Sequence, residues 1–159
     1  MKKSIIWEIL ALLTVSIIVA AGVNLMRPDP LPWLGDFTEK KYEEAAAKGL
    51  EPMTPGEAAA FLGADGYLFI DARTPEEFAA GHVAGAKNLP FEAIFGDMDA
   101  ATKDTPKDAT LIVYCSDIGC GKSKDMAESL KAAGFTRTVT MPEGMEGWLA
   151  AGYKTEAGQ

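Results

Sequence analysis

The sequence predicts an α/β domain with a central parallel sheet, preceded by one helix long enough to cross a membrane. Short apolar, β-branched runs at residues 67–70, 110–114 and 137–141 alternate with segments that carry helix start and stop signals. Strands that alternate with helices form parallel sheets covered on both faces, so we expect three layers. A separate apolar stretch over residues 5–26 predicts the additional helix.

Composition limits the size and the class of the protein. The 159 residues leave room for one domain and a tail, and 48% apolar residues suffice for a core. A net charge of −8 without a basic stripe argues against nucleic-acid binding. Two cysteines cannot form a disulfide framework, and one histidine leaves too few ligands for an ordinary zinc site, so we expect no metal or cofactor.

The N-terminal segment resembles a membrane anchor. Residues 5–26 would span about 33 Å as a helix, enough for a hydrocarbon core. Lys2 and Lys3 should keep residues 1–4 in the cytoplasm, so this single span of the inner membrane would place the soluble domain outside, in the periplasm of a Gram-negative cell. A cleaved signal peptide with a small-residue site at 19–21 is the alternative. We favour a retained signal-anchor in contact with lipid, because the apolar stretch continues past that site.

Residues 27–52 separate the anchor from the domain. Three prolines directly after the span predict a stiff, extended linker. A charged helix over residues 38–48, stopped by Gly49, is expected to be a solvated spacer, with a docking helix for a partner as the alternative. The domain itself is expected over residues 53–159.

The remaining elements of the domain follow from capping signals. Helices begin at Thr54-Pro55 and at Thr74-Pro75, and Thr74 with Glu77 forms a capping box. Further elements are a short strand over 86–89, a partly helical segment over 91–101, a helix over 123–134 and a closing helix over 143–152. Ligands of such sheets bind beyond the carboxyl ends of the strands, where Asp71, Cys115 and the turn at 141–144 fall.

The strand at 110–114 leads directly into the segment that holds both cysteines. Cys115 follows the strand, and a glycine-containing loop connects it to the helix over 123–134. Converging backbone N–H groups and the helix dipole favour a thiolate there, and the thiolate is the reactive form of cysteine.

Several motifs resemble the rhodanese (sulfurtransferase) domain. They are DARTPEEF at 71–78, GHVAGAKNLP at 81–90, VYC at 113–115, AGF at 133–135 and EGMEGW at 143–148. Their order and spacing match that family over about residues 53–154. The resemblance implies a small α/β domain whose cysteine takes a sulfane sulfur from a small donor, becomes a persulfide and passes the sulfur to a thiophilic acceptor. Cys115 is then the nucleophile.

The resemblance also assigns the loop and its supports. The cysteine loop, residues 115–123, continues through Ser116, Asp117, Ile118, Gly119, Cys120, Gly121, Lys122 and Ser123. Its amides are expected to stabilise anionic sulfur, and its one cation, Lys122, to attract an anionic donor. Asp71 is expected to fix a neighbouring loop and Asn88 to support backbone groups. Arg73 is expected to pair with Glu77 or Asp71, with direct substrate contact as the alternative. His82 is expected to be a structural turn residue, with a general base as the alternative.

The cysteine loop departs from the family pattern Cys-x-x-Gly-x-Arg-Ser. It is two residues longer, and Lys122 replaces the usual arginine, so bidentate oxyanion binding is lost and thiosulfate becomes a doubtful donor. Gly121 stands where phosphatase and arsenate-reductase relatives need arginine, which disfavours their chemistry. Cys120 either fills space or acts as a resolving cysteine that forms a disulfide with Cys115.

Three functions remain open from the sequence. The first is a membrane-anchored sulfurtransferase that uses a Cys115 persulfide. The second is a non-catalytic accessory subunit of a membrane complex, which would need a membrane-protein partner. The third is a redox relay through a dithiol and disulfide of Cys115 and Cys120.

Overall fold

The computed structural model describes residues 2–27 and 38–158, with side chains from Ile5 onward. The chain divides into two compact units, residues 1–36 and 37–159. Most of the predicted proline-rich linker lies outside the described residues.

Helix α1 (Lys2–Leu25) is the described element of the first unit. Its segment Ile5–Leu25 has a mean hydropathy of 2.3, and its large apolar side chains are exposed. The predicted apolar helix is therefore present. By length and composition it is a candidate membrane anchor, and a signal sequence at an N-terminus shares these properties.

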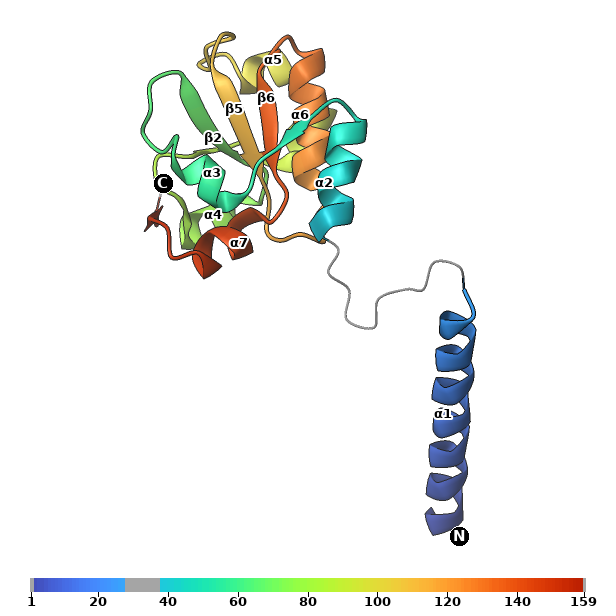
Figure 1. Cartoon of the computed structure of the whole chain (residues 1–159). Coiled ribbons are helices and arrows are strands. Elements are labelled where there is room, and N and C mark those ends of the chain that lie inside the picture. The colour runs from blue at the N-terminus through green and yellow to red at the C-terminus, as the bar shows by residue number, and fades with distance from the viewer. Residues whose placement is uncertain (1, 28–37, 159) are drawn as a thin grey trace. The chain divides into compact units, whose positions relative to one another are not determined.

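A five-stranded parallel sheet forms the centre of the second unit, as the sequence predicts (Figure 1). In spatial order its strands are β1 (Glu51–Pro52), β6 (Thr138–Met141), β5 (Thr110–Tyr114), β2 (Tyr67–Asp71) and β4 (Lys87–Asn88). The register pairs Asp71 with Tyr114 and Tyr114 with Met141, so the carboxyl ends of the three central strands lie level with one another.

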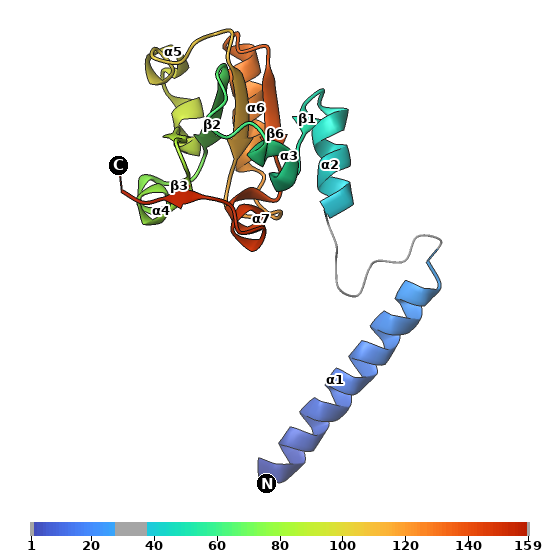
Figure 2. The same cartoon turned by 60° about the vertical axis from the view of Figure 1, so that its left-hand side comes forward.

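Helices cover both faces of this sheet, which confirms the predicted layers (Figures 1 and 2). One face carries α2 (Thr38–Ala47), α6 (Lys122–Ala132), the 3-10 helix η1 (Phe91–Phe95) and α5 (Met98–Ala101). The other carries α3 (Pro55–Ala59) and α7 (Gly144–Ala150), and α4 (Pro75–Ala80) lies by the carboxyl ends of the strands.

Strand β5 divides the core into two halves by simple alternation. Leu111 and Val113 are fully buried on the face of α2 and α6. Ile112 and Tyr114 are fully buried on the opposite face, where they share a cluster with Trp148 of α7. Because side chains alternate along a strand, a strand buried on both faces is apolar at successive positions, which is the pattern of residues 111–114.

Helix α2 does not behave as the predicted solvated spacer. Ala45 and, just after the helix, Leu50 are only 2% exposed and belong to the domain core. Lys48 forms an ion pair with Glu128 of α6, and the Tyr42 hydroxyl donates to the Met53 carbonyl at 3.2 Å. Small alanines gave the helix a weak apolar pattern, but they let it approach the core closely. The helix is part of the second unit.

A second, two-stranded sheet was not predicted. Strands β3 (His82–Val83) and β7 (Thr155–Glu156) pair antiparallel, with His82 opposite Glu156. Two residues are too few to show a periodic pattern, so no local signal identifies either strand.

Candidate active site at the carboxyl ends of the strands

Backbone contacts from α7 hold Cys115 in place. The Cys115 carbonyl accepts the amide N–H of Met145 at 2.8 Å, and the Ser116 carbonyl accepts that of Glu146 at 2.9 Å. Gly144 permits this approach, because a Cβ there would lie 2.5 Å from the Cys115 carbonyl oxygen and its φ is +62°. The first turn of α7 therefore packs directly on the backbone of the cysteine loop.

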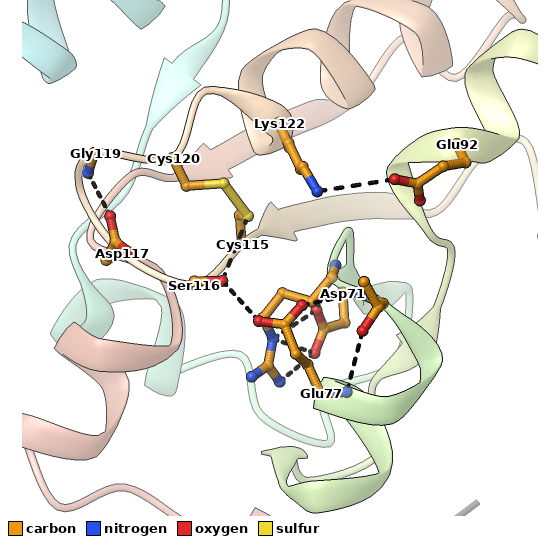
Figure 3. Close-up of a disulfide and its surroundings, with 11 residues drawn as sticks. Asp71, Glu77, Glu92, Cys115, Ser116, Asp117, Gly119, Cys120 and Lys122 are labelled. Carbon is orange, nitrogen blue, oxygen red and sulfur yellow. Dashed lines mark hydrogen bonds and ion pairs between the residues drawn. A yellow bond between two sulfur atoms is a disulfide. The ribbon is translucent and has the colours of Figure 1, made fainter.

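The cysteine loop folds back on itself and brings its two cysteines together. Asp117 makes the turn, because its carboxylate accepts the Gly119 amide N–H at 2.7 Å and its carbonyl accepts that of Cys120 at 3.1 Å. A disulfide joins Cys115 to Cys120 across a Cα–Cα distance of 6.3 Å (Figure 3). Cys115 is 2% exposed, whereas Cys120 is half-buried.

The cysteine loop also leaves amide donors without internal partners. In the described part of the chain, the amide N–H groups of Ser116, Asp117 and Ile118 donate no hydrogen bond. Helix α6 begins at Lys122 without a side-chain cap from Gly121, so its first turn adds further N–H groups. Donors of this kind stabilise negative charge on sulfur.

Arg73 and Asp71 form a buried ion pair beside this loop. Asp71 is fully buried, and its carboxylate accepts Arg73 Nε at 3.0 Å and Nη2 at 2.6 Å. Burial lowers the pKa of Arg73, but the hydrogen bond and charge of Asp71 outweigh that effect and raise the pKa. Nη2 also donates to the Gly81 carbonyl at 2.7 Å. Of the two partners expected for Arg73, the structure shows Asp71.

Two further predicted supports have structural surroundings. His82 is 5% exposed, its Nδ1 lies 2.9 Å from the Phe78 carbonyl, and its ring stacks on Phe78 at 3.7 Å. The Asn88 amide donates to the carbonyls of Asp71 at 3.1 Å and Arg73 at 3.0 Å. These side-chain contacts are to backbone carbonyls and to the Phe78 ring.

Tyr114 closes the inner wall of the site. Its hydroxyl accepts the Val83 amide N–H at 3.1 Å. Burial, with the nearby charge of Asp71 as the next cause, raises the pKa of Tyr114 well above its usual range. The phenol is therefore neutral at physiological pH and is part of the buried cluster that includes Trp148.

Lys122, the cation of the cysteine loop, has an acidic partner outside that loop. Its Nζ lies 3.8 Å from a carboxylate oxygen of Glu92 and 5.8 Å from the ring centre of Phe91. Figure 3 shows the Lys122 side chain directed toward Glu92 of η1. The Glu92 carboxylate therefore offsets part of the positive charge that Lys122 presents to an anion.

Glu77 is a site residue that the sequence assigned only to helix capping and to pairing with Arg73. Its carboxylate accepts the Thr74 amide N–H at 3.1 Å, which completes the predicted capping box. The other carboxylate oxygen accepts the Ser116 hydroxyl at 3.2 Å, and Ser116 Oγ lies 3.9 Å from Cys115 Sγ (Figure 3). The hydrogen bond from Thr74 is the main cause that lowers the pKa of Glu77.

A small, partly open pocket lies beside the other cysteine. Cys120, Lys124 and Pro142 line it, together with Lys41 and Ala45 from α2. Helix α2 therefore contributes to the surroundings of the cysteine loop. Among the described residues, no cluster of three histidine, cysteine or acidic side chains is arranged to hold a metal ion.

Comparison with known families assigns the domain. Residues 54–151 match the rhodanese-like domain family. The chain belongs to this family. A thiosulfate sulfurtransferase (GlpE) of Pseudomonas putida is 30% identical over 107 residues, which cover 67% of this chain and 91% of the relative. Thiosulfate sulfurtransferase 16 of Arabidopsis thaliana is 30% identical over 104 residues, or 58% of this chain and 82% of the relative.

Solved structures agree on the rhodanese fold. The rhodanese-like domain of an Anabaena protein superposes with a TM-score of 0.58 at 23% identity, covering 67% of this chain and 78% of that one. A thiosulfate sulfurtransferase of Pseudomonas aeruginosa gives a TM-score of 0.60 at 24% identity, covering 76% of this chain and 22% of that one.

Proposed function

We propose that the protein is a sulfurtransferase that moves sulfane sulfur through a persulfide on Cys115. The position of Cys115 carries the proposal, because this cysteine directly follows β5 and begins the loop that has unpartnered amides and leads into α6. Relatives named as sulfurtransferases support the same chemistry.

The reaction begins with reduction of the disulfide. Two thiols convert the Cys115–Cys120 bond into two free cysteines and leave as one disulfide. The Cys115 thiolate then attacks the outer sulfur of a small donor, which releases the rest of the donor with the electron pair of the broken bond. A thiophilic acceptor finally attacks the outer sulfur of the persulfide and restores the Cys115 thiolate.

A second candidate function rests on the disulfide itself. If the Cys120 thiolate attacks Sγ of a Cys115 persulfide, the Cys115–Cys120 bond forms and hydrosulfide leaves. The protein would then act as a dithiol and disulfide relay, and a Cα–Cα distance of 6.3 Å suits repeated closure of that bond.

The cellular setting is part of the proposal. We place α1 in the inner membrane as a retained signal-anchor, in contact with lipid through residues 5–26, with the domain in the periplasm. An oxidising compartment favours the closed disulfide, so a reductant must precede each sulfur transfer. The partners are a small sulfur donor, a thiophilic acceptor and a membrane protein that the anchor brings close.

Intact-mass measurement tests the proposal. The reduced full chain is treated with thiosulfate or a polysulfide, alongside the Cys115→Ser and Cys120→Ser variants. A gain of one sulfur, about 32 Da, that needs Cys115 but not Cys120 supports transfer. A loss of two hydrogens that needs both cysteines favours the relay, and no adduct with any donor would sink the sulfurtransferase proposal.

A further inference from the structure

A carboxylate is connected to the Cys115 sulfur through one hydroxyl. Glu77 accepts the Ser116 hydroxyl at 3.2 Å, and Ser116 Oγ lies 3.9 Å from Cys115 Sγ. Figure 3 shows Glu77 of α4 directed toward Ser116 from across the site. The two residues are 39 positions apart, so the fold and not the local sequence brings them together.

The direction of this hydrogen bond has a consequence for the sulfur. The hydrogen bond from Thr74 keeps Glu77 ionised, and an ionised carboxylate can only accept hydrogen bonds. Ser116 must therefore use its single hydroxyl hydrogen on Glu77. Its oxygen lone pairs remain for the sulfur, so Ser116 offers no donor to an anion at Cys115.

The cations around Cys115 are already engaged with carboxylates. Arg73 is bound to the buried Asp71, and Lys122 lies 3.8 Å from Glu92. Other charged residues also lie near the cysteine loop. Asp117 belongs to the loop, and Glu143 and Glu146 lie at the start of α7. Lys41, Glu44 and Lys124 line the pocket beside Cys120. The two lysines of that pocket lie beside Cys120, whereas the Ser116 hydroxyl next to Cys115 is bound to the Glu77 carboxylate.

We propose that Glu77, acting through Ser116, is a specificity-determining positioning residue that makes Cys115 prefer sulfur donors of low negative charge over dianionic donors. This inference rests on the proposed sulfurtransferase function. The thiolate takes the outer sulfur of thiosulfate and releases sulfite, or takes that of methanethiosulfonate and releases methanesulfinate. Both steps form the same persulfide, and the two donors differ by one negative charge.

The chain offers a matched pair of variants for the test. Glu77→Gln removes the charge but keeps an oxygen acceptor, and glutamine also completes capping boxes. Glu57 occupies the same position in the capping box of α3, where its carboxylate accepts Thr54. Glu57→Gln therefore makes the same change in net charge and in capping, without a neighbouring cysteine.

The donor preference of the reduced full chain is the first readout. We compare kcat/KM for methanethiosulfonate with that for thiosulfate. In Glu77→Gln the ratio should fall by about 3- to 10-fold at low salt, the size expected for one partly screened charge, and the effect should shrink in 1 M salt. Glu57→Gln should keep the ratio of the unmodified protein.

Alkylation supplies a readout that needs no sulfur transfer. Iodoacetate is anionic and iodoacetamide is neutral, and peptide mass mapping in a Cys120→Ser background reports their rates at Cys115 alone. Glu77→Gln should raise the relative rate of iodoacetate by a similar factor. Equal alkylation ratios in all three proteins, or a Cys115 that neither reagent reaches, would overturn the inference. If Glu77→Gln raises the relative rate of iodoacetate as expected but no donor forms a persulfide on Cys115, the proposed sulfurtransferase function is rejected instead.

Discussion

Cys115 and Cys120 lie on the same loop but are held in opposite ways. Cys115 is 2% exposed and directly follows the central strand β5. Two hydrogen bonds from α7 hold the backbone carbonyls of Cys115 and Ser116. Cys120 is half-buried between two glycines, and a turn made by Asp117 positions it. Cys115 is therefore held by the core elements β5 and α7, whereas Cys120 lies in a partly exposed turn.

This difference suggests a division of work within the disulfide. A sulfur that carries cargo must stay aligned with the amides around it, and the frame of β5 and α7 provides that alignment. A sulfur that opens and closes a bond must be reachable by a reductant, and Cys120 is half-buried and lines a pocket. Variants that remove either cysteine, or the contacts that position it, test this division.

Loss of the Cys115 sulfur should have the largest effect. Cys115→Ser removes the nucleophile, so the rate of thiocyanate formation from a sulfur donor and cyanide should fall at least about 1,000-fold. Cys120→Ser is the matched control, because it also lacks the disulfide but should keep most of the activity. Comparable loss in both variants would show that the two sulfurs are not divided in this way.

Gly144→Ala should disrupt the packing of α7 against the backbone of Cys115. The new methyl group would lie 2.5 Å from the Cys115 carbonyl oxygen, in addition to the cost of a φ of +62°. We expect a loss of about 3 kcal/mol or more in the free energy of unfolding by urea. Gly152→Ala is the control, because its φ is +74° but nothing lies within 4 Å of the new Cβ. Its loss should stay near 1–2 kcal/mol, and equal losses in both variants would contradict the packing argument.

Cys120→Ser should affect stability only through the disulfide. Closing a loop of this length should stabilise the oxidised protein by about 2 kcal/mol through the unfolded chain. The variant should therefore unfold at lower urea than the oxidised parent, yet match the reduced parent. A difference that persists under reducing conditions would mean that Cys120 packs as a structural residue.

Asp117→Ala should have the smallest effect, and it should alter the position of Cys120 but not the reactivity of Cys115. It removes the acceptor of the Gly119 amide and loosens the turn, which should cost about 1 kcal/mol. Reoxidation after reduction should become slower, as followed by loss of free thiols, while persulfide formation on reduced Cys115 stays unchanged. A loss of persulfide formation would show that Asp117 also supports the reactivity of Cys115.

The sequence predicts the frame of this site well because strong local patterns encode it. Residues 111–114 are apolar at successive positions, as a strand buried on both faces requires, and Thr74 with Glu77 marks a helix start. The contact of Glu77 with Ser116 has no such signal, since it depends on where α4 lies relative to the end of β5. The sequence of α2 indicates a solvated spacer, although Ala45 packs in the core, because alanine packs closely but contributes little to an apolar pattern.

Locating the transferred sulfur tests the central claim most directly. The reduced full chain is treated with one equivalent of donor, trapped by alkylation and fragmented, so that fragment ions separate Cys115 from Cys120. The account predicts an additional 32 Da, one sulfur atom, on Cys115 alone, which cyanide removes with formation of an equal amount of thiocyanate. An added sulfur on Cys120, or one on Cys115 that no acceptor removes, would contradict it.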